Sequence, residues 1–520
     1  MNRARRVIAT GVGLALLWLL PVTGARAVPA TEPDPTAMVN GPVRTIVQAG
    51  NVVWLGGSFT QAEDPSGANP LAVNGLVPVD DATGTINRSV HIPTLTATTG
   101  AAIVYDASLS SDGILYFVGS FSRVDGAVRK NVAAINAATG ALLPFAPRTG
   151  PAKSVLATAS GIYVGTSRLL SFQLDATPTP GYTAPLVSVD PKLRAHATEP
   201  VFRDIAPLDA TTLIAACQCD SLTDSQGPTP VKAIVEIDAR SGGLLDWAPG
   251  GLTAKSGAFG ISLVVHVVAG SAHPWVFLAA GGSDFTAAYD AVAGGQRWKT
   301  DTSGSSQAVA WYEGQIAVGG HFDWTQRPAG HACGDNANPD VSCFHSPRLV
   351  AMDPVNGHVV TDGAGQPWNP GICCKYNGVW ALAADTDGGS LHVGGEFTQM
   401  GGVWSGSGVQ WTLTNHANQS NYGRLSDDGA SPNKVLQVSP AGTGSGLVGS
   451  IPSGILCPNV CEASYTAGTK VTLVVSPAAG STFAGWSGDC TGTGACKLTM
   501  DRNHQVTATF TLSPSRVRAG

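Results

Sequence analysis

Ionisable side chains gather in one stretch of this 520-residue chain, between residues 321 and 345. His321, Asp323, His331 and His345 are residue types that bind transition metals such as zinc. However, no His-x-x-x-His or Glu-x-x-His spacing ties them together. We therefore interpret the stretch as a solvated loop pinned by a disulfide, and a metal site is the alternative.

A second acidic segment, residues 385–390 (Asp-Thr-Asp-Gly-Gly-Ser), begins like a calcium-binding loop. It has carboxylates at alternate positions with glycine after them, but it lacks the later bidentate glutamate of an EF-hand. A hairpin turn between two strands is the preferred interpretation, because Asp and Gly are turn residues. No cofactor is predicted, and weak calcium binding at this segment is the alternative.

The ten cysteines fall in local pairs, and an even count in an exported chain favours disulfides. Two of the pairs are so close in sequence that they bridge only with strain, so pairing across the two sites is as acceptable as local pairing. The pairs are Cys333/Cys343, Cys457/Cys461 and Cys490/Cys496, and the two close ones are Cys217/Cys219 and Cys373/Cys374.

Aromatic and amide side chains gather in an insertion at residues 400–421. Trp404, Trp411 and Asn415 are predicted to form a ligand-binding surface, since a sugar can stack on an exposed indole. If these indoles are buried, they serve packing alone.

The elements that must position these residues are repeats of one short strand that ends in glycine. Such a strand is expected to run into a β-bulge or a tight bend. The copies are 52–60 (VVWLGGSFT), 117–122 (FVGSFS), 279–285 (AAGGSDF), 316–322 (IAVGGHF) and 391–398 (LHVGGEFT), with weaker copies at 162–166 and 213–217.

A second repeated feature is an apolar strand that ends in Asp or Asn, with glycine four residues later. The first residue can cap the turn with its side chain, and glycine accepts the left-handed conformation that closes it. The pairs are Asp80/Gly84, Asn136/Gly140, Asp238/Gly242, Asp290/Gly294 and Asp353/Gly357. Aromatic residues before proline, Phe145, Trp247 and Trp368, are expected to fill the outer packing of such units.

The repeats predict an all-β protein whose main body is a β-propeller over residues 42–425. Counting the glycine-ended strands gives seven units, and six or eight are the alternatives. A single sheet of this kind would leave both apolar faces bare, whereas a ring of radial sheets buries them against neighbours. The array resembles the β-propeller domains of secreted actinobacterial proteins.

The chain begins with a predicted signal peptide, residues 1–27, which has early arginines, an apolar run and an Ala-Arg-Ala exit. Its export route, general secretory or twin-arginine, stays open. Removal of its four arginines from the 30 basic residues leaves 26 against 36 acidic ones, a formal charge of −10, which argues against nucleic acid as a partner. We expect a secreted or surface-associated protein with no transmembrane segment after residue 27.

The remaining boundaries follow from composition: an extended lead-in at 28–41, a linker at 426–433, a small module at 434–512 and a tail at 513–520. The module has two cysteine pairs around Phe483 and Trp486, which are expected to anchor a core that two disulfides support. It resembles the divergent internalin-type B-repeat domain of bacterial surface proteins. That resemblance implies a small ubiquitin-like or grasp-type β fold used as a spacer or adhesive unit.

These features predict a non-catalytic binding or adhesion protein that presents propeller loops to an extracellular glycan or envelope protein. The alternative is a propeller enzyme, a polysaccharide lyase or hydrolase, or a quinoprotein dehydrogenase, to which Cys373-Cys374 beside Trp368 and Trp380 is similar. The haem motif Cys-x-x-Cys-His and the Gly-x-Ser-x-Gly and His-Glu-x-x-His motifs are absent from the sequence. An enzyme would need ionisable groups that converge at the central mouth of the ring.

Overall fold

The computed structural model describes residues 33–512 with several gaps. The segments outside the description are 190–198, 248, 253–257, 269, 327–342, 362–364, 366, 373–376, 386–388, 401, 405–410, 414–420, 427–432, 459–460, 467–468 and 501–503. The predicted signal peptide and tail lie outside the described residues, as does most of the linker. Among the described residues, no helix has the length and apolar character needed to cross a membrane.

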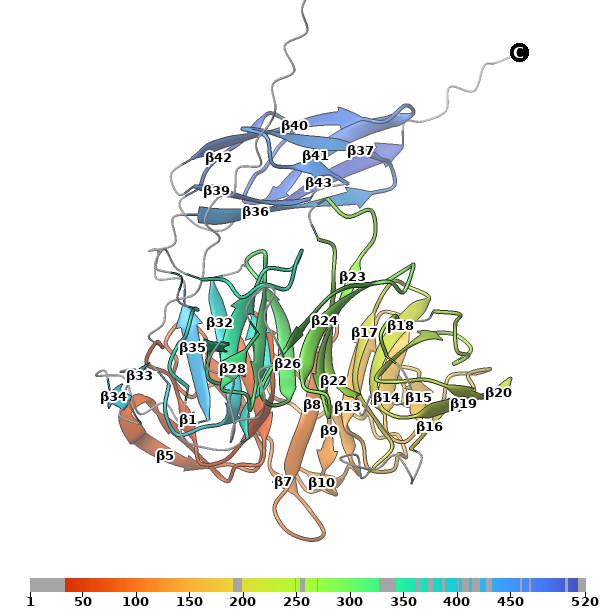
Figure 1. The fold of residues 1–520 in the computed structure, drawn as a ribbon, viewed down its shortest axis with the longest axis vertical. Helices are drawn as coiled ribbons and strands as arrows, with labels where there is room; N and C mark the ends of the chain where they lie inside the picture. Colours follow the sequence, from red (N-terminus) through yellow and green to blue (C-terminus); the bar gives the residue numbers. More distant parts are fainter. Residues whose placement is uncertain are drawn as a thin grey trace, which may run out of the picture.

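Within the described residues, seven antiparallel sheets of three or four strands follow one another along the chain (Figure 1). Their inner strands are β2 (Val43–Ala49), β8 (Ile103–Leu109), β13 (Ser154–Thr158), β17 (Val201–Pro207), β22 (Phe259–His266), β26 (Ser306–Tyr312) and β31 (Gly378–Ala384). Their second strands are β3 (Val52–Gly57), β9 (Ile114–Ser120), β14 (Gly161–Gly165), β18 (Thr212–Gln218), β23 (Trp275–Gly281), β27 (Gln315–Gly320) and β32 (Ser390–Glu396).

The third strands complete the sheets on the outside. They are β6 (Leu76–Asp80), β12 (Val132–Asn136), β15 (Leu169–Phe172), β21 (Ile234–Asp238), β24 (Phe285–Asp290), β30 (Leu349–Met352) and β35 (Tyr422–Ser426), and β25 (Gln296–Asp301) adds a fourth strand. Smaller sheets flank several of them: β1 (Met38–Val39) with β4 (Gln61–Asp64) and β5 (Ala68–Ala72), β7 (Leu95–Thr96) with β10 (Arg123–Val124) and β11 (Ala127–Val128), β16 (Leu186–Ser188) with β19 (Ser221–Asp224) and β20 (Gly227–Pro230), β28 (Trp324–Thr325) with β29 (Phe344–His345), and β33 (Gly402–Trp404) with β34 (Trp411–Leu413).

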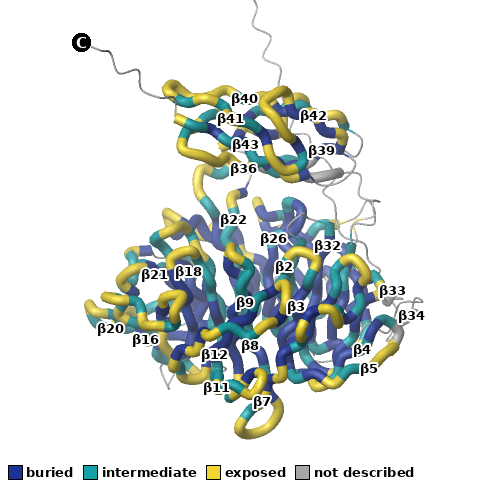
Figure 2. The backbone as a smooth tube through the Cα atoms, turned by 180° about the vertical axis from the view of Figure 1, so that it is seen from behind, coloured by how far each residue is buried: buried dark blue, intermediate teal, exposed yellow. Residues whose placement is uncertain are grey.

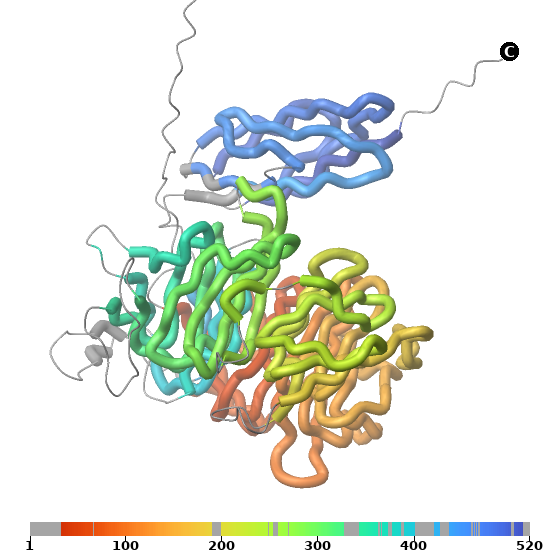
Figure 3. Tube along the Cα trace, turned by 45° about the vertical axis from the view of Figure 1, so that its right-hand side comes forward, coloured from red at the N-terminus to blue at the C-terminus, as the bar shows by residue number. Residues whose placement is uncertain are grey.

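The sheets close into a ring, so the main body is a β-propeller. Each inner strand contacts the inner strand of the next sheet, and β31 contacts β2 again. Figure 3 follows this path through the colours, with the N-terminal sheet beside the last propeller sheet. Apolar side chains fill the contacts between the sheets. In Figure 2 the strands of the propeller are largely buried, and the loops that connect them are largely exposed. The all-β propeller prediction is confirmed.

The segment predicted as a lead-in takes part in the closure of this ring. Asp34 bridges Arg424 of β35 through the backbone, and Asn421 Nδ2 donates to the Val39 carbonyl at 2.8 Å. The propeller therefore takes in residues before Pro42, because the last sheet needs an outer partner that the chain's beginning supplies.

The repeated turns have the predicted chemistry. In the first one, Gly84 N donates to the Asp80 carbonyl at 2.8 Å, and Asp80 Oδ1 accepts from Thr83 N at 2.9 Å. Gly84 has a φ of +68°, in the region that glycine tolerates best. The other four turns repeat the glycine-to-carbonyl bond. Phe145, Trp247 and Trp368 are buried, as expected of packing residues.

The C-terminal module consists of two four-stranded sheets. One contains β39 (Glu462–Thr466), β36 (Asn433–Gly442), β43 (His504–Leu512) and β41 (Ser481–Gly488), and the other contains β38 (Leu456–Cys457), β37 (Gly446–Ile451), β40 (Lys470–Pro477) and β42 (Cys496–Thr499). Side chains of both sheets form one core with Trp486. The described part of the module contains no helix, so the grasp-type expectation is wrong: alternating apolar residues give each sheet one buried face, and the two faces cover each other.

Candidate binding site at the axial mouth

A β-bulge occurs near the beginning of six inner strands, always at the same place. In β2, for example, Val43 pairs with Gly57 and Thr45 with Gly56, so Arg44 is left without a partner residue on β3. A bulge inserts one extra residue and re-aims its side chain. The extra residues are Arg44, Tyr105, Arg203, Ile261, Gln307 and Trp380. Lys153 occupies the matching place directly before β13.

These seven residues, one from each sheet, line a single cavity of about 270 Å³. We call them the axial ring. The cavity is bounded by inner strands from all around the propeller and therefore lies on its axis. Its volume is near the lower limit of small-molecule sites, roughly 300 Å³, so it suits one small group better than a length of polymer.

The repeated glycines of the sequence exist because of these bulges. A Cβ at Gly57 would lie 2.0 Å from the Pro42 carbonyl oxygen, and one at Gly395 would lie 2.1 Å from the carbonyl oxygen of Gly378. At these two positions the bulged inner strand approaches its neighbour so closely that an added Cβ would clash with the backbone, whereas Ala280 and Cys217 take the corresponding places in β23 and β18. The prediction that these strands run into a bulge is confirmed.

The residue that ends the second strand, or directly follows it, contacts the ring residue of the same sheet in three sheets. Gln218 Oε1 accepts from Arg203 Nη2 at 2.6 Å, and the Ser58 hydroxyl accepts from Arg44 Nε at 3.4 Å. The amide of Gln307 lies 3.2 Å from His321 Nδ1. Variable residues of the glycine repeat thus orient the groups that face the axis.

Cationic and aromatic side chains alternate around part of the ring. Lys153 Nζ lies 3.5 Å from the centre of the Tyr105 ring. The Arg44 guanidinium carbon lies 5.2 Å from the Trp380 ring centre and 5.7 Å from that of Tyr105. Such contacts stabilise the cations over the ring faces. Burial lowers the pKa of Arg44 and of Arg203, but a guanidinium stays charged at neutral pH.

Two carboxylates stand directly behind the ring. Asp106 accepts from Val155 N at 2.8 Å and Asp204 accepts from Leu263 N at 2.8 Å, each across the seam to the next sheet. Burial, aided by the charge of Asp204, raises the pKa of Asp106 to about 7. Burial likewise raises the pKa of Asp204. Because their pKa values are raised, these two carboxyls offset the charge of the three cations less than ordinary carboxylates would near neutral pH.

The C-terminal module stands at the other end of the ring. Val265 and Trp311, near the ends of their inner strands, line a cavity of about 720 Å³ together with Val438 and Pro440 of the module. The bulges lie near the beginnings of the same strands, so the axial ring is at the end away from the module.

The candidate metal ligands of the alternative interpretation of residues 321–345 do not converge among the described residues. Asp323 faces Arg348 at 3.3 Å, and the His345 ring packs edge-on to Trp324, while His331 lies outside the description. Burial lowers the pKa of His321 and of His345. His321 contacts the axial ring through Gln307.

Trp404 and Trp411 pair directly across β33 and β34. The placement of their side chains, and all of Asn415, is outside the described part of the chain, so this surface stays a prediction. Asp385 of the acidic turn does meet a histidine and a second aspartate, as discussed below, and Asp387 is outside the description.

The cysteines are disulfide-bonded wherever they are described. Cys217 is joined to Cys219, Cys457 to Cys461, and Cys490 to Cys496. Cys217 and Cys219 therefore pair locally. Cys343 is also disulfide-bonded, whereas Cys333, Cys373 and Cys374 lie outside the described residues.

Sequence reasoning missed six of the seven ring residues and named Trp380 only beside the cysteine pair. A weak signal exists: in five inner strands the ring residue precedes a small polar or acidic residue, namely Thr45, Asp106, Ser154, Asp204 and Ser262. Only an alignment of the inner strands of all repeats would have shown that the ring residue occupies the same position in each repeat.

Comparison with known proteins identifies the C-terminal module. Residues 450–514 match the family model of the divergent InlB B-repeat domain. No curated protein matches the chain. Among solved structures, the WD40 β-propeller domain of Doa1 is similar with a TM-score of 0.41 at 9% identity, covering 76% of this chain and 97% of that one. The computationally designed Ika8 protein is similar with a TM-score of 0.39 at 10% identity, covering 76% and 99%. The chain thus joins a β-propeller to a module similar to the divergent InlB B-repeat domain.

Proposed function

We propose that this protein is an exported, non-catalytic binding protein whose axial mouth takes an acidic group of an extracellular glycan. The observation that carries the proposal is the axial ring, in which Arg44, Lys153 and Arg203 converge with Tyr105 and Trp380 on one small cavity. Guanidinium groups bind carboxylate, sulfate or phosphate in two-pronged fashion, and aromatic rings stack on sugar faces.

Three features support a binding role. The ring residues differ in type from sheet to sheet while the backbone around them repeats, as expected where a scaffold presents a recognition surface. The cavity is too small for a polymer, so the ligand would offer a chain end or a projecting acidic substituent. Trp404 and Trp411, which pair across one outer hairpin, would supply a second contact with a longer glycan.

The enzyme alternative has one specific observation in its favour. A carboxyl with a pKa of about 7, as at Asp106, suits a general acid or base. However, Asp106 accepts a hydrogen bond from Ala107 N on one oxygen and from Val155 N on the other, so it braces two sheets. We therefore favour binding without turnover.

Titration calorimetry with acidic oligosaccharides, each paired with its carboxyl-reduced or desulfated counterpart, tests the proposal. We expect the acidic member of at least one pair to bind, and the Arg44→Ala/Arg203→Ala double variant to lose at least about 100-fold in affinity. Arg88→Ala is the matched control, because Arg88 pairs with Asp64 away from the mouth. Equal binding of both members of every pair, or an unaffected double variant, would contradict the assignment.

The same samples test the other possibilities. New reducing ends or unsaturated products that disappear in Asp106→Asn would establish an enzyme. Loss of binding in Trp404→Ala/Trp411→Ala, with the arginine double variant unaffected, would move the site to the outer hairpin. If the protein binds an envelope protein and none of the glycans, its ligand is a protein and the proposed glycan ligand is wrong.

A further inference from the structure

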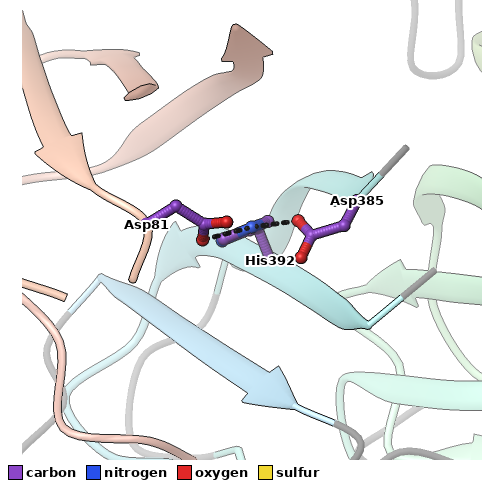
Figure 4. A group of neighbouring side chains, drawn as sticks. All are labelled: Asp81, Asp385 and His392. Atoms are coloured by element: carbon purple, nitrogen blue, oxygen red, sulfur yellow. Dashed lines mark hydrogen bonds and ion pairs between the residues drawn. The ribbon is translucent and has the colours of Figure 1, made fainter. Parts of the chain in front are cut away.

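A separate group of potential metal ligands lies at the seam where the propeller closes. Asp81 follows β6 of the first sheet, whereas Asp385 follows β31 and His392 lies in β32 of the last sheet. His392 Nε2 is 2.7 Å from Asp385 Oδ1 and 3.5 Å from Asp81 Oδ1, as Figure 4 shows. Among the described residues, this is where three side chains of metal-binding type converge.

We propose that Asp81, Asp385 and His392 bind a divalent transition metal of the zinc class. One ligand atom from each residue lies within 4.8 Å of the other two. Zinc takes imidazole nitrogen and carboxylate oxygen at about 2.0–2.2 Å, so small side-chain rotations would bring all three atoms around one ion. The imidazole makes calcium the poorer fit, because calcium prefers oxygen ligands throughout.

The histidine is oriented for this role by a buried tyrosine. The Tyr422 hydroxyl lies 2.8 Å from His392 Nδ1, and both side chains are almost fully buried. Histidines that bind metals have such a partner on the second ring nitrogen. Burial raises the pKa of Tyr422, so its hydroxyl stays protonated.

Arg424 is the cation nearest to this group, and its position is compatible with the proposal. Its Nε donates to Asp34 Oδ2 at 2.9 Å, and its Nη1 donates to the Asp81 backbone carbonyl. The contact from Nη1 to Asp81 Oδ1 is longer, 3.3 Å. The guanidinium therefore holds the Asp81 backbone and the Asp34 carboxylate, and because Gln48 Nε2 donates to Asp81 Oδ2 at 3.2 Å, Oδ1 is the Asp81 oxygen that would face an ion.

A metal at this place would connect the first sheet to the last. The seam is otherwise closed by the packing of β2 against β31 and β32 and by contacts of the chain's beginning with β35. Because the ion binds only when both sheets are in place, it would stabilise the closed ring in proportion to its free concentration.

Zinc and cobalt ions, added to chelator-treated full-length protein that carries no histidine tag, test this site. We expect one zinc ion per chain by calorimetry and a rise in melting temperature of about 2–5 °C at saturating zinc, with no rise in calcium. Cobalt should give the visible absorption of a low-coordinate site. Asp385→Asn and His392→Gln should abolish the stoichiometric binding.

His504→Gln is the matched control, since His504 Nδ1 also contacts a carboxylate, Asp489 Oδ2, at 3.0 Å, but among the described residues the pair does not form a group of three metal-ligand side chains. Its zinc stoichiometry should equal that of the wild type. If His392→Gln does not fold, Asp81→Asn at the more exposed ligand replaces it. Wild-type protein that binds no zinc, or that keeps its zinc in Asp385→Asn and Asp81→Asn, would overturn the proposal and leave His392 as a hydrogen-bonded structural residue.

Discussion

The two ends of the propeller bring different ionisable side chains together. Where the inner strands begin, Arg44, Lys153 and Arg203 point into one cavity. Where β31 and β6 end, the aspartates Asp385 and Asp81 meet His392. The same sheets thus present cations to the axis at one end and carboxylates to a seam at the other.

The difference has a simple structural origin. In six of the seven sheets a bulge aims one side chain at the axis, where a ligand can enter. A turn that follows a strand places its aspartate at the seam between neighbouring sheets, where the partners come from the protein itself. The first arrangement is suited to recognition and the second to holding the ring together.

The largest expected effect is on stability, and it comes from a substitution opposite the bulge that presents Arg44. Gly57→Ala places a Cβ 2.0 Å from the Pro42 carbonyl oxygen, so the bulge that presents Arg44 cannot form without a backbone shift. We expect a loss of about 3 kcal/mol or more in the free energy of unfolding, measured in urea. Gly150→Ala, at an exposed glycine with open space around it, should change stability little. Equal stabilities of the two variants would refute the close-approach argument.

The sequence predicts features that depend on residues close together in the chain, and it does not predict contacts between residues that are far apart in the chain. Glycine-ended strands and Asp-to-Gly turns are local features, and they correctly predicted the ring of sheets. The ring residues share a position but no residue type, so no motif marks Arg44, Tyr105 or Gln307. The contact between Asp81 and His392 exists only because the first and last sheets meet, and no local pattern contains that information.

The support of Arg203 by Gln218 gives the next effect. Gln218→Ala removes the acceptor at 2.6 Å from Arg203 Nη2 and lets the guanidinium leave the mouth. We expect the affinity for the acidic ligand to fall about 10-fold, with the melting temperature nearly unchanged. Ser120 holds the matching place behind Tyr105, and Ser120→Ala should leave the affinity unaltered. An equal loss in both variants would mean that the second position acts through general packing.

The net charge at the mouth should depend on pH. Asp106, with a pKa of about 7, gains a negative charge as the pH rises from 6 to 8, which opposes the nearby cations. The affinity for an acidic ligand should therefore fall by a factor of about 3–5 over this range, and Asp106→Asn should flatten the profile. Calorimetry at constant ionic strength measures both. If the wild-type affinity instead rises with pH, ionisation of Asp106 does not weaken the binding of an acidic ligand, and the prediction is wrong.

The smallest effect comes from the apolar member of the ring. Ile261 takes the place that cations hold in the sheets of Arg44 and Arg203, and its side chain is half-buried at the cavity wall. Ile261→Lys would add a fourth cation, and at the effective dielectric constant of a wet cavity we expect a 2–5-fold gain in affinity for the acidic ligand. Ile261→Met adds similar length without charge and should give no gain. Because salt screens a charge effect, the advantage of lysine over methionine should shrink as ionic strength rises, whereas a gain that is independent of salt would assign it to packing.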